Sequence, residues 1–158
     1  MKRVLDMCCG ARRFYADQTD SRVLACDIRH EDLTEKIGRP CNVSPDVIQD
    51  FRNLPAEWTG RFDLVIFDPP HFTQAGEKSY MRAKYGVLNK ETWKEDLAAG
   101  FKEGFRVLRS GGTLIFKWNE THVKLFDVLK LTSVKPLILN KKPTQSKTHW
   151  IVFYKEAA

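Results

Sequence analysis

The stretch FDLVIFDPPHF, residues 62–72, joins an apolar run to an acid, two prolines and a histidine. Its first part has the continuous apolar character of a strand that is buried on both faces of a parallel sheet. Asp68 ends the run, and Pro69 and Pro70 then fix two backbone φ angles and remove two N–H donors. Because a strand can end without this combination, the motif is the first candidate for a functional site.

Apolar segments alternate with helical patterns on both sides of this motif. Strands are expected at 3–7, 22–27, 46–50, 62–68, 113–118, 134–139 and 148–155. Helices are expected at 11–18, 89–109 and 122–131. The order predicts a doubly wound α/β domain, with a mostly parallel seven-stranded sheet and helices on both faces. The link between the last two strands is too short for a crossover, so these strands should pair antiparallel.

Composition indicates one soluble domain that covers residues 1–158. No apolar run approaches the roughly 20 residues that a membrane-spanning helix needs, and the N-terminus lacks a signal-peptide pattern. A cytoplasmic location without a membrane partner is therefore expected. The formal net charge is +6, and six lysines face one acid between residues 124 and 147. Such a segment suits a nucleic-acid partner and, equally, a plain solvated face.

Four cysteines occupy positions 8, 9, 26 and 41. No C-x-x-C spacing is present, and the nearby His30 lacks the spacing of a zinc ligand. The four thiols are therefore expected to be reduced, small and buried, and no metal site is predicted.

Acidic residues recur at the ends of the expected strands. Asp6 lies near the end of the first strand, while Asp27, Asp50 and Asp68 end the next three. Ligands of doubly wound sheets bind beyond these ends, so the four acids should share one polar site. Asp27 follows Asp6 by about twenty residues, the separation at which an acid receives ribose hydroxyls. Gly10 is not part of a G-x-G-x-x-G pattern, which favours S-adenosylmethionine over NAD or ATP.

With these residues, the chain resembles the class I S-adenosylmethionine-dependent methyltransferases over essentially its whole length. DPPH after the fourth strand is similar to the Asp/Asn/Ser-Pro-Pro-aromatic motif of the amino-methyltransferases, and VLDMCCGARRFY to their first motif. Together with KWNE and KTHWIVFYK, these motifs resemble small methyltransferases of bacteriophages and integrated elements. The resemblance implies a single-domain Rossmann-like fold, no separate target-recognition domain, and a bacterial or phage-infected host cell.

The resemblance also implies roles for individual residues. Gly10 would let S-adenosylmethionine lie close to the backbone, Asp27 would take the ribose hydroxyls, and Asp50 with Phe51 would contact the adenine. The full cofactor set is Asp6, Cys8, Gly10, Asp27, Ile28, Asp50, Phe51 and Asp68. The catalytic set is Asp68, Pro69, Pro70 and His71.

The chemistry of that catalytic set suits an amine of low nucleophilicity. An exocyclic amine on a base is conjugated into the ring, and two hydrogen-bond acceptors would raise its electron density and aim its lone pair. The Asp68 carboxylate and the Pro69 carbonyl can be these acceptors, held in place by the prolines. His71, with Phe72 beside it, stands where the family stacks an aromatic ring on an extruded or single-stranded base.

Basic and aromatic residues alternate in the loop from 71 to 88, directly after the motif. Such interleaving serves both phosphates and base faces, although a mobile, solvated loop has the same composition. The expected substrate-binding residues are Phe72, Lys78, Tyr80, Arg82, Lys84 and Tyr85.

The leading hypothesis is an N-methyltransferase that acts on an exocyclic amine of a nucleic-acid base, in DNA or RNA. Adenine N6 is favoured on the habit of the family. Target recognition would then use a short sequence context, a homo-oligomer or a partner protein. Two alternatives stay open: methylation of a protein amide or small molecule, and a catalytically silent module that binds cofactor or nucleic acid in regulation or anti-defence.

Overall fold

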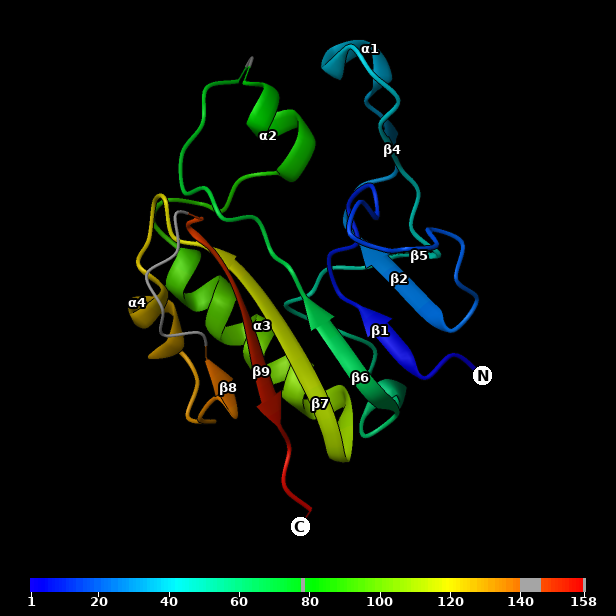
Figure 1. The fold of residues 1–158 in the computed structure, drawn as a ribbon, viewed down its shortest axis with the longest axis vertical. Coiled ribbons are helices and arrows are strands. Elements are labelled where there is room, and N and C mark those ends of the chain that lie inside the picture. The colour runs from blue at the N-terminus through cyan, green and yellow to red at the C-terminus, as the bar shows by residue number, and fades with distance from the viewer. Residues whose placement is uncertain (78, 140–145, 158) are drawn as a thin grey trace.

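The computed structural model describes residues 1–77, 79–139 and 146–157. Its centre is a seven-stranded sheet (Figure 1). Across the sheet the strands are β5 (Val47–Ile48), β2 (Val23–Asp27), β1 (Val4–Asp6), β6 (Phe62–Phe67), β7 (Leu108–Asn119), β9 (Thr148–Tyr154) and β8 (Ile138–Leu139). Pairing is parallel from β5 to β7, and antiparallel on both sides of β9. The predicted mostly parallel sheet with an antiparallel C-terminal strand is therefore confirmed.

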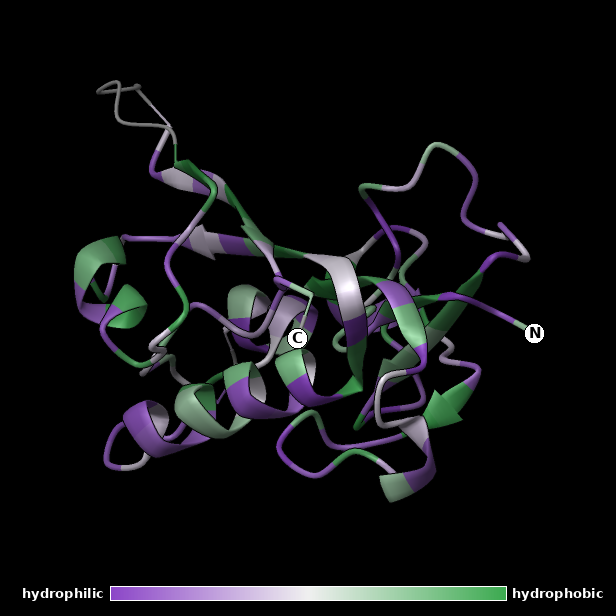
Figure 2. Cartoon of the chain, turned by 90° about the horizontal axis from the view of Figure 1, so that it is seen from below, coloured by the Kyte–Doolittle hydropathy of each residue, from purple (hydrophilic) through white to green (hydrophobic). Residues whose placement is uncertain are grey.

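Two helices, α3 (Trp93–Val107) and α4 (Leu125–Leu129), pack on one face of the sheet (Figure 2). Phe101 of α3 and Val128 of α4 share one core with the alternate β7 residues Phe116 and Trp118. Both helices were expected from their apolar spacing. β7 begins at Leu108, directly after α3, and so starts earlier than the sequence indicated.

The opposite face differs from the expectation of helices on both faces. Residues 11–18 were predicted to be helical, but they form turns in which Arg12 has a φ of +51°. The Arg12 guanidinium donates hydrogen bonds to the carbonyls of Gln18 and Ser44, at 3.2 and 3.1 Å, which hold the segment in this irregular path. Within the residues that the structure describes, the helices that pack on the sheet therefore lie on one face. The other face leaves Trp150 and Tyr154 of β9 43% and 44% exposed.

A smaller unit stands beyond the carboxyl ends of the parallel strands (Figure 1). It consists of β3 (Glu31–Asp32) and β4 (Asn42–Val43), which pair antiparallel, with α1 (Thr34–Ile37) between them. The helix α2 (Tyr80–Tyr85) contacts this unit, because Arg39 Nη2 donates to the Tyr80 hydroxyl at 2.6 Å. Arg29 Nη1 donates to the Ala83 carbonyl at 3.0 Å. Nowhere in the described part of the chain is a helix long and apolar enough to cross a membrane.

Candidate active site

A cavity of about 310 Å³ opens at the carboxyl ends of β1, β2 and β6. The strand ends, the loop after β1, the segment after β5 and the loop around α2 all contribute to its wall. Most of the residues predicted from the sequence meet there. The predicted residues that line the cavity are Cys8, Gly10, Asp27, Ile28, Asp50, Phe51, Asp68, Pro69, Pro70, His71, Lys84 and Tyr85.

The loop after β1, called the first loop below, is tied to the end of β2. The Gly10 N–H donates a hydrogen bond to Asp27 Oδ2, at 3.0 Å. Gly10 has a φ of +47°, a conformation that favours glycine, and a Cβ added there would meet no atom within 4 Å. The Gly10 backbone therefore faces open space. Asp27 Oδ1 accepts from the Arg29 N–H at 3.0 Å, and an ionised carboxylate has lone pairs left for hydroxyl groups in the cavity.

Asp6 lies behind the wall of the cavity and does not line it. Its side chain is fully buried, and it accepts hydrogen bonds from the Cys8 N–H at 3.1 Å and the Tyr15 hydroxyl at 2.8 Å. Burial raises the pKa of Asp6 to about 7, although the bonds from Tyr15 and Cys8 act in the opposite direction. Asp6 therefore holds the first loop in place through its hydrogen bond from the Cys8 N–H. Cys9, Cys26 and Cys41 are buried, as expected, whereas Cys8 is half-buried.

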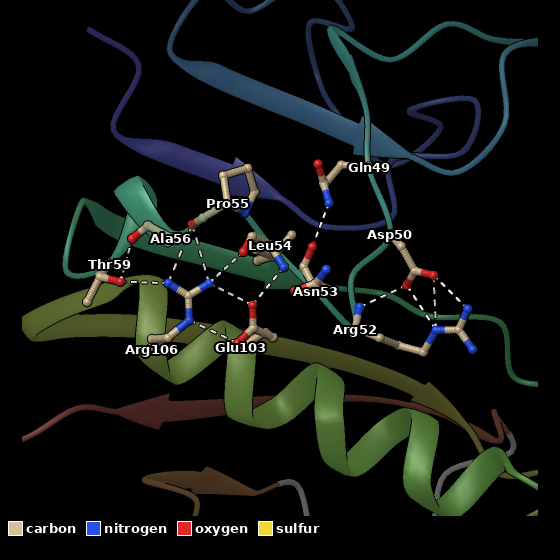
Figure 3. A network of polar contacts seen from close by, with 10 residues as sticks. All are labelled: Gln49, Asp50, Arg52, Asn53, Leu54, Pro55, Ala56, Thr59, Glu103 and Arg106. Atoms are coloured by element: carbon tan, nitrogen blue, oxygen red, sulfur yellow. Dashed lines mark hydrogen bonds and ion pairs between the residues drawn. The ribbon is translucent and has the colours of Figure 1, made fainter.

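Asp50 lines the cavity, but its charge is already paired (Figure 3). Arg52 Nη2 lies 2.6 Å from Asp50 Oδ2, and Arg52 Nη1 lies 2.9 Å from Asp96 Oδ1. The hydrogen bond from Arg52 is the main cause that lowers the pKa of Asp50. Phe51, the next residue, packs against Phe67 of β6 with ring centroids 5.3 Å apart.

A polar network fixes this wall to α3 (Figure 3). The Leu54 N–H donates to Glu103 Oε2 at 2.7 Å, and Arg106 Nη2 donates to the same carboxylate oxygen at 2.6 Å. Arg106 also donates to the Leu54 carbonyl at 2.9 Å and to Thr59 Oγ1 at 2.6 Å. The segment after β5 is thereby anchored at several points, so Phe51 is held in position before any ligand arrives.

The DPPH motif brings Asp68 into contact with two nitrogen-bearing side chains. His71 Nε2 lies 3.0 Å from Asp68 Oδ1, and Lys117 Nζ lies 2.7 Å from Asp68 Oδ2. Asp68 is 13% exposed and His71 11% exposed. The His71 ring also packs edge-on against Trp118, with centroids 5.1 Å apart. His71 therefore helps to hold the Asp68 side chain in position.

No family model matches the sequence, and no similar protein is found among curated proteins. Solved structures do match. The N-methyltransferase NodS from Bradyrhizobium japonicum superposes with a TM-score of 0.60, at 12% identity over 98% of this chain and 85% of its own. An S-adenosylmethionine-dependent methyltransferase from Methanosarcina mazei superposes with a TM-score of 0.57, at 13% identity over 98% of this chain and 92% of its own. The fold is that of the S-adenosylmethionine-dependent methyltransferases.

A 16S rRNA methyltransferase from T. thermophilus shares this methyltransferase fold, with a TM-score of 0.53 at 14% identity. The match covers 99% of this chain and 36% of that one, whose structure holds AdoMet and guanosine. The matches therefore include N-methylating and RNA-methylating enzymes. At these identities they show the fold alone.

The loop after the DPPH motif is more ordered than its composition indicated, because it contains α2. Lys84 and Tyr85 of α2 line the cavity, whereas Tyr80 contacts Arg39, and Arg82 donates to the Ala75 carbonyl at 3.1 Å. Phe72 packs edge-on against His122 at 4.8 Å and does not line the cavity. Lys78 and residues 140–145 of the lysine-rich segment lie outside the described residues.

Several lining residues were not predicted. Lys117 is the clearest, because it contacts Asp68 directly. The sequence held a signal for it, since a lysine near the end of the apolar strand TLIFKW needs a polar partner. The others are Met7, Cys9, Ala11, Arg12, Arg13, Phe14, Arg29, Arg52, Asp96 and residues 86–89.

Proposed function

We propose that the protein is an S-adenosylmethionine-dependent methyltransferase that methylates an exocyclic amine of a nucleic-acid base. One observation carries the proposal: the Asp68-Pro69-Pro70 turn opens into the same cavity as the Gly10–Asp27 pair. The pair suits a nucleoside, and the turn suits an amine, so cofactor and acceptor would meet within one cavity.

The residues of the cavity fit this cofactor. Gly10 leaves backbone space, and the Asp27 carboxylate can accept hydrogen bonds from ribose hydroxyls. Ile28 is 61% exposed beside Asp27, and Phe51 lines the same wall, so a planar ring has apolar surface to contact. When bound, S-adenosylmethionine supplies a methyl group made electrophilic by a positively charged sulfur.

The chain's own contribution to the reaction is orientation. The Asp68 carboxylate and the Pro69 carbonyl would accept the two N–H bonds of the target amine, which directs the nitrogen lone pair into the cavity. Lys117 and His71 hold the Asp68 carboxylate in place, and the anchored wall around Phe51 limits movement of the bound nucleoside.

A nucleic acid is the favoured acceptor because basic and aromatic side chains stand at the cavity. Lys84 and Tyr85 line it from α2, and the chain carries a net charge of +6. Adenine N6, in DNA or RNA, follows from the DPPH resemblance. A second copy or a partner protein would supply further target recognition.

The test is transfer of labelled methyl groups to duplex DNA, single-stranded DNA, RNA and protein, offered in parallel. We expect label in one nucleic-acid pool, and a loss of about 100-fold or more in Asp68→Ala, as for removal of one stabilising group at a reacting centre. Cofactor affinity should stay close to that of the wild type, because Asp68 faces the acceptor.

Asp63→Ala is the matched control, because Asp63 lies near the start of β6, the strand that Asp68 follows, and pairs with Arg3 and Arg109. It should transfer methyl groups at the wild-type rate. Label in protein alone, or in no pool, would reject the proposed acceptor. An Asp68→Ala variant that loses cofactor affinity in proportion to its activity would reject the assignment of Asp68.

A further inference from the structure

Lys117 lies between the catalytic motif and two aromatic rings. Its Nζ is 2.7 Å from Asp68 Oδ2. The same nitrogen is 5.5 Å from the ring centroid of Phe14 and 5.6 Å from that of Trp150. The two rings meet edge to face, with centroids 5.5 Å apart and planes at 83°. Loop, β7 and β9 thus each contribute one member to a compact group beside Asp68.

This group lies outside the hydrophobic core. Phe116 and Trp118, the neighbours of Lys117 along β7, are fully buried on the side of α3, so Lys117 projects from the opposite face. Trp150 is the register partner of Lys117 on β9 and is 43% exposed. Phe14 and Lys117 line the cavity. The open face of the sheet is therefore continuous with the cavity at Lys117.

We propose that Phe14, Lys117 and Trp150 form the acceptor subsite, in which an unpaired nucleic-acid base stacks against the aromatic rings while its amine reaches Asp68. The inference rests on the proposed function and names the surface that receives the substrate. Aromatic rings stack on every base because each base has a π-face, so the subsite holds the base without selecting its identity. Selection is left to the hydrogen bonds that Asp68, Pro69 and Lys117 make with the edge of the base.

Lys117 acts in this subsite as a positioning residue. Its ammonium group has three N–H donors, and within the described residues one of them is used, on Asp68. That bond fixes the rotamer of the carboxylate that must face the amine. The other two donors can reach a ring nitrogen or a carbonyl oxygen of the same base.

The first test measures binding of a fluorescently labelled single-stranded oligonucleotide by anisotropy, without cofactor. Trp150→Ala is compared with Tyr154→Ala, because Tyr154 lies on the same strand and the same face and is equally exposed, at 44% against 43%. We expect affinity to fall roughly 5- to 100-fold in Trp150→Ala, the range found for loss of one stacking residue. Tyr154→Ala should bind like the wild type. Equal affinities of the two variants would overturn the subsite.

Phe14→Ala extends this comparison to the loop, with Phe126→Ala as its control. Phe126 is 65% exposed on α4, on the other side of the sheet. A weaker affinity in Phe14→Ala alone supports the subsite. If Phe14→Ala binds the oligonucleotide with wild-type affinity, the loop is not part of the subsite.

The second test addresses Lys117 by steady-state kinetics. Lys117→Met should lower kcat about tenfold or more, because the carboxylate loses its fixed orientation, and Lys117→Arg should recover most of this loss by keeping a charged donor. A residue with a merely structural role would lower the melting temperature of Lys117→Met and leave kcat unchanged. That outcome, or no recovery in Lys117→Arg, would overturn the positioning role.

The experiments distinguish failure of the acceptor subsite from failure of the proposed methyltransferase activity. Oligonucleotide binding that depends on Trp150, in a protein that transfers no methyl group, would keep the subsite and remove the proposed activity. Methyl transfer to nucleic acid that is insensitive to Trp150→Ala and Phe14→Ala would keep the activity and remove the subsite.

Discussion

At the residue scale, four similar carboxylates at neighbouring strand ends have different surroundings. Asp27 pairs with Arg29, and Asp68 pairs with Lys117. Both carboxylates line the cavity and have lone pairs left for a ligand. Asp50 is paired with Arg52, and Asp6 is buried beneath the first loop. Because a carboxylate's chemistry is set by burial and by its partners, these acids cannot have interchangeable roles.

Asp27→Ala tests the cofactor half of the site. We expect the free energy of S-adenosylmethionine binding to weaken by about 1–3 kcal/mol, the cost of removing a partner from buried polar groups. Part of this loss arises because the Gly10 N–H also loses its acceptor. Isothermal titration calorimetry measures it, with Asp32→Ala as a control at an exposed acid nearby. If Asp27→Ala and Asp32→Ala bind S-adenosylmethionine with equal affinity, the nucleoside is held elsewhere.

At the element scale, the site depends on how closely α3 approaches the sheet. Gly100 lies where α3 crosses Phe67 of β6 and Phe51 of the cavity wall. The network of Glu103 and Arg106 then fixes the segment after β5 to the same helix. A single helix therefore sets both the core packing and the position of the cavity wall.

Gly100→Ala should destabilise the protein by about 1–3 kcal/mol, the usual cost of an added methyl group in a packed core. The new Cβ would collide with the Phe67 ring and lie 2.9 Å from Phe51 Cδ2. Urea unfolding measures the change. Gly76→Ala is the control, because a Cβ there meets nothing within 4 Å. A Gly100→Ala variant as stable as the control would show that α3 can shift without cost.

The helix α2 lines the cavity through Lys84 and Tyr85, and its Tyr80 contacts Arg39 of the smaller unit. Tyr80→Phe removes the hydrogen bond from Arg39, and loss of about 0.5–1.5 kcal/mol should speed amide exchange in α2 roughly 2- to 10-fold. Hydrogen exchange followed by mass spectrometry over residues 79–86 measures this. Tyr154→Phe, on β9, is the control and should leave the exchange of α2 unchanged. No difference between the two variants would mean that other contacts hold α2.

At the scale of the whole molecule, one face of the sheet is packed and the other is open. The core lies between the sheet and α3 with α4, whereas the loop from 11 to 20 contacts the opposite face through Phe14 and Tyr15. That loop buries Asp6 under Tyr15, which couples the first loop of the cavity to the stability of the fold. The pH dependence of folding should report on this coupling.

Asp6 should make the free energy of unfolding fall as pH rises. Its pKa is raised from 3.8 to about 7 in the folded protein, so the folded state binds the proton more tightly than the unfolded state. The stabilisation is complete below about pH 4 and is lost as pH rises through about 7. Asp6→Asn removes this contribution. Urea unfolding of both proteins at about pH 5 and pH 8 should show a larger fall in the wild type, and parallel curves would contradict the burial of a protonated Asp6.

The sequence by itself determined the positions along the chain of the seven strands of the main sheet, the acids at the strand ends and the DPPH motif. These follow from local apolar runs and from residue chemistry, and the cavity gathers most of the residues they indicated. The helix at 11–18 was wrong, because Arg12 and its bonds to Gln18 and Ser44 favour an irregular path over a helical one. Helix propensity reflects only neighbouring residues, so it could not indicate that Arg12 would bond to the carbonyl of the distant Ser44.

Only the tertiary structure decided which side chains gather around Lys117, the ion-pair partner of Asp68. Phe14, Lys117 and Trp150 come from a loop and two strands that are far apart in the chain, and the register of β7 and β9 brings the last two together. The burial of Asp6 depends in the same way on Tyr15 folding back over it. Sheet register and burial are set by long-range packing, whereas a sequence pattern reports only the preferences of neighbouring residues.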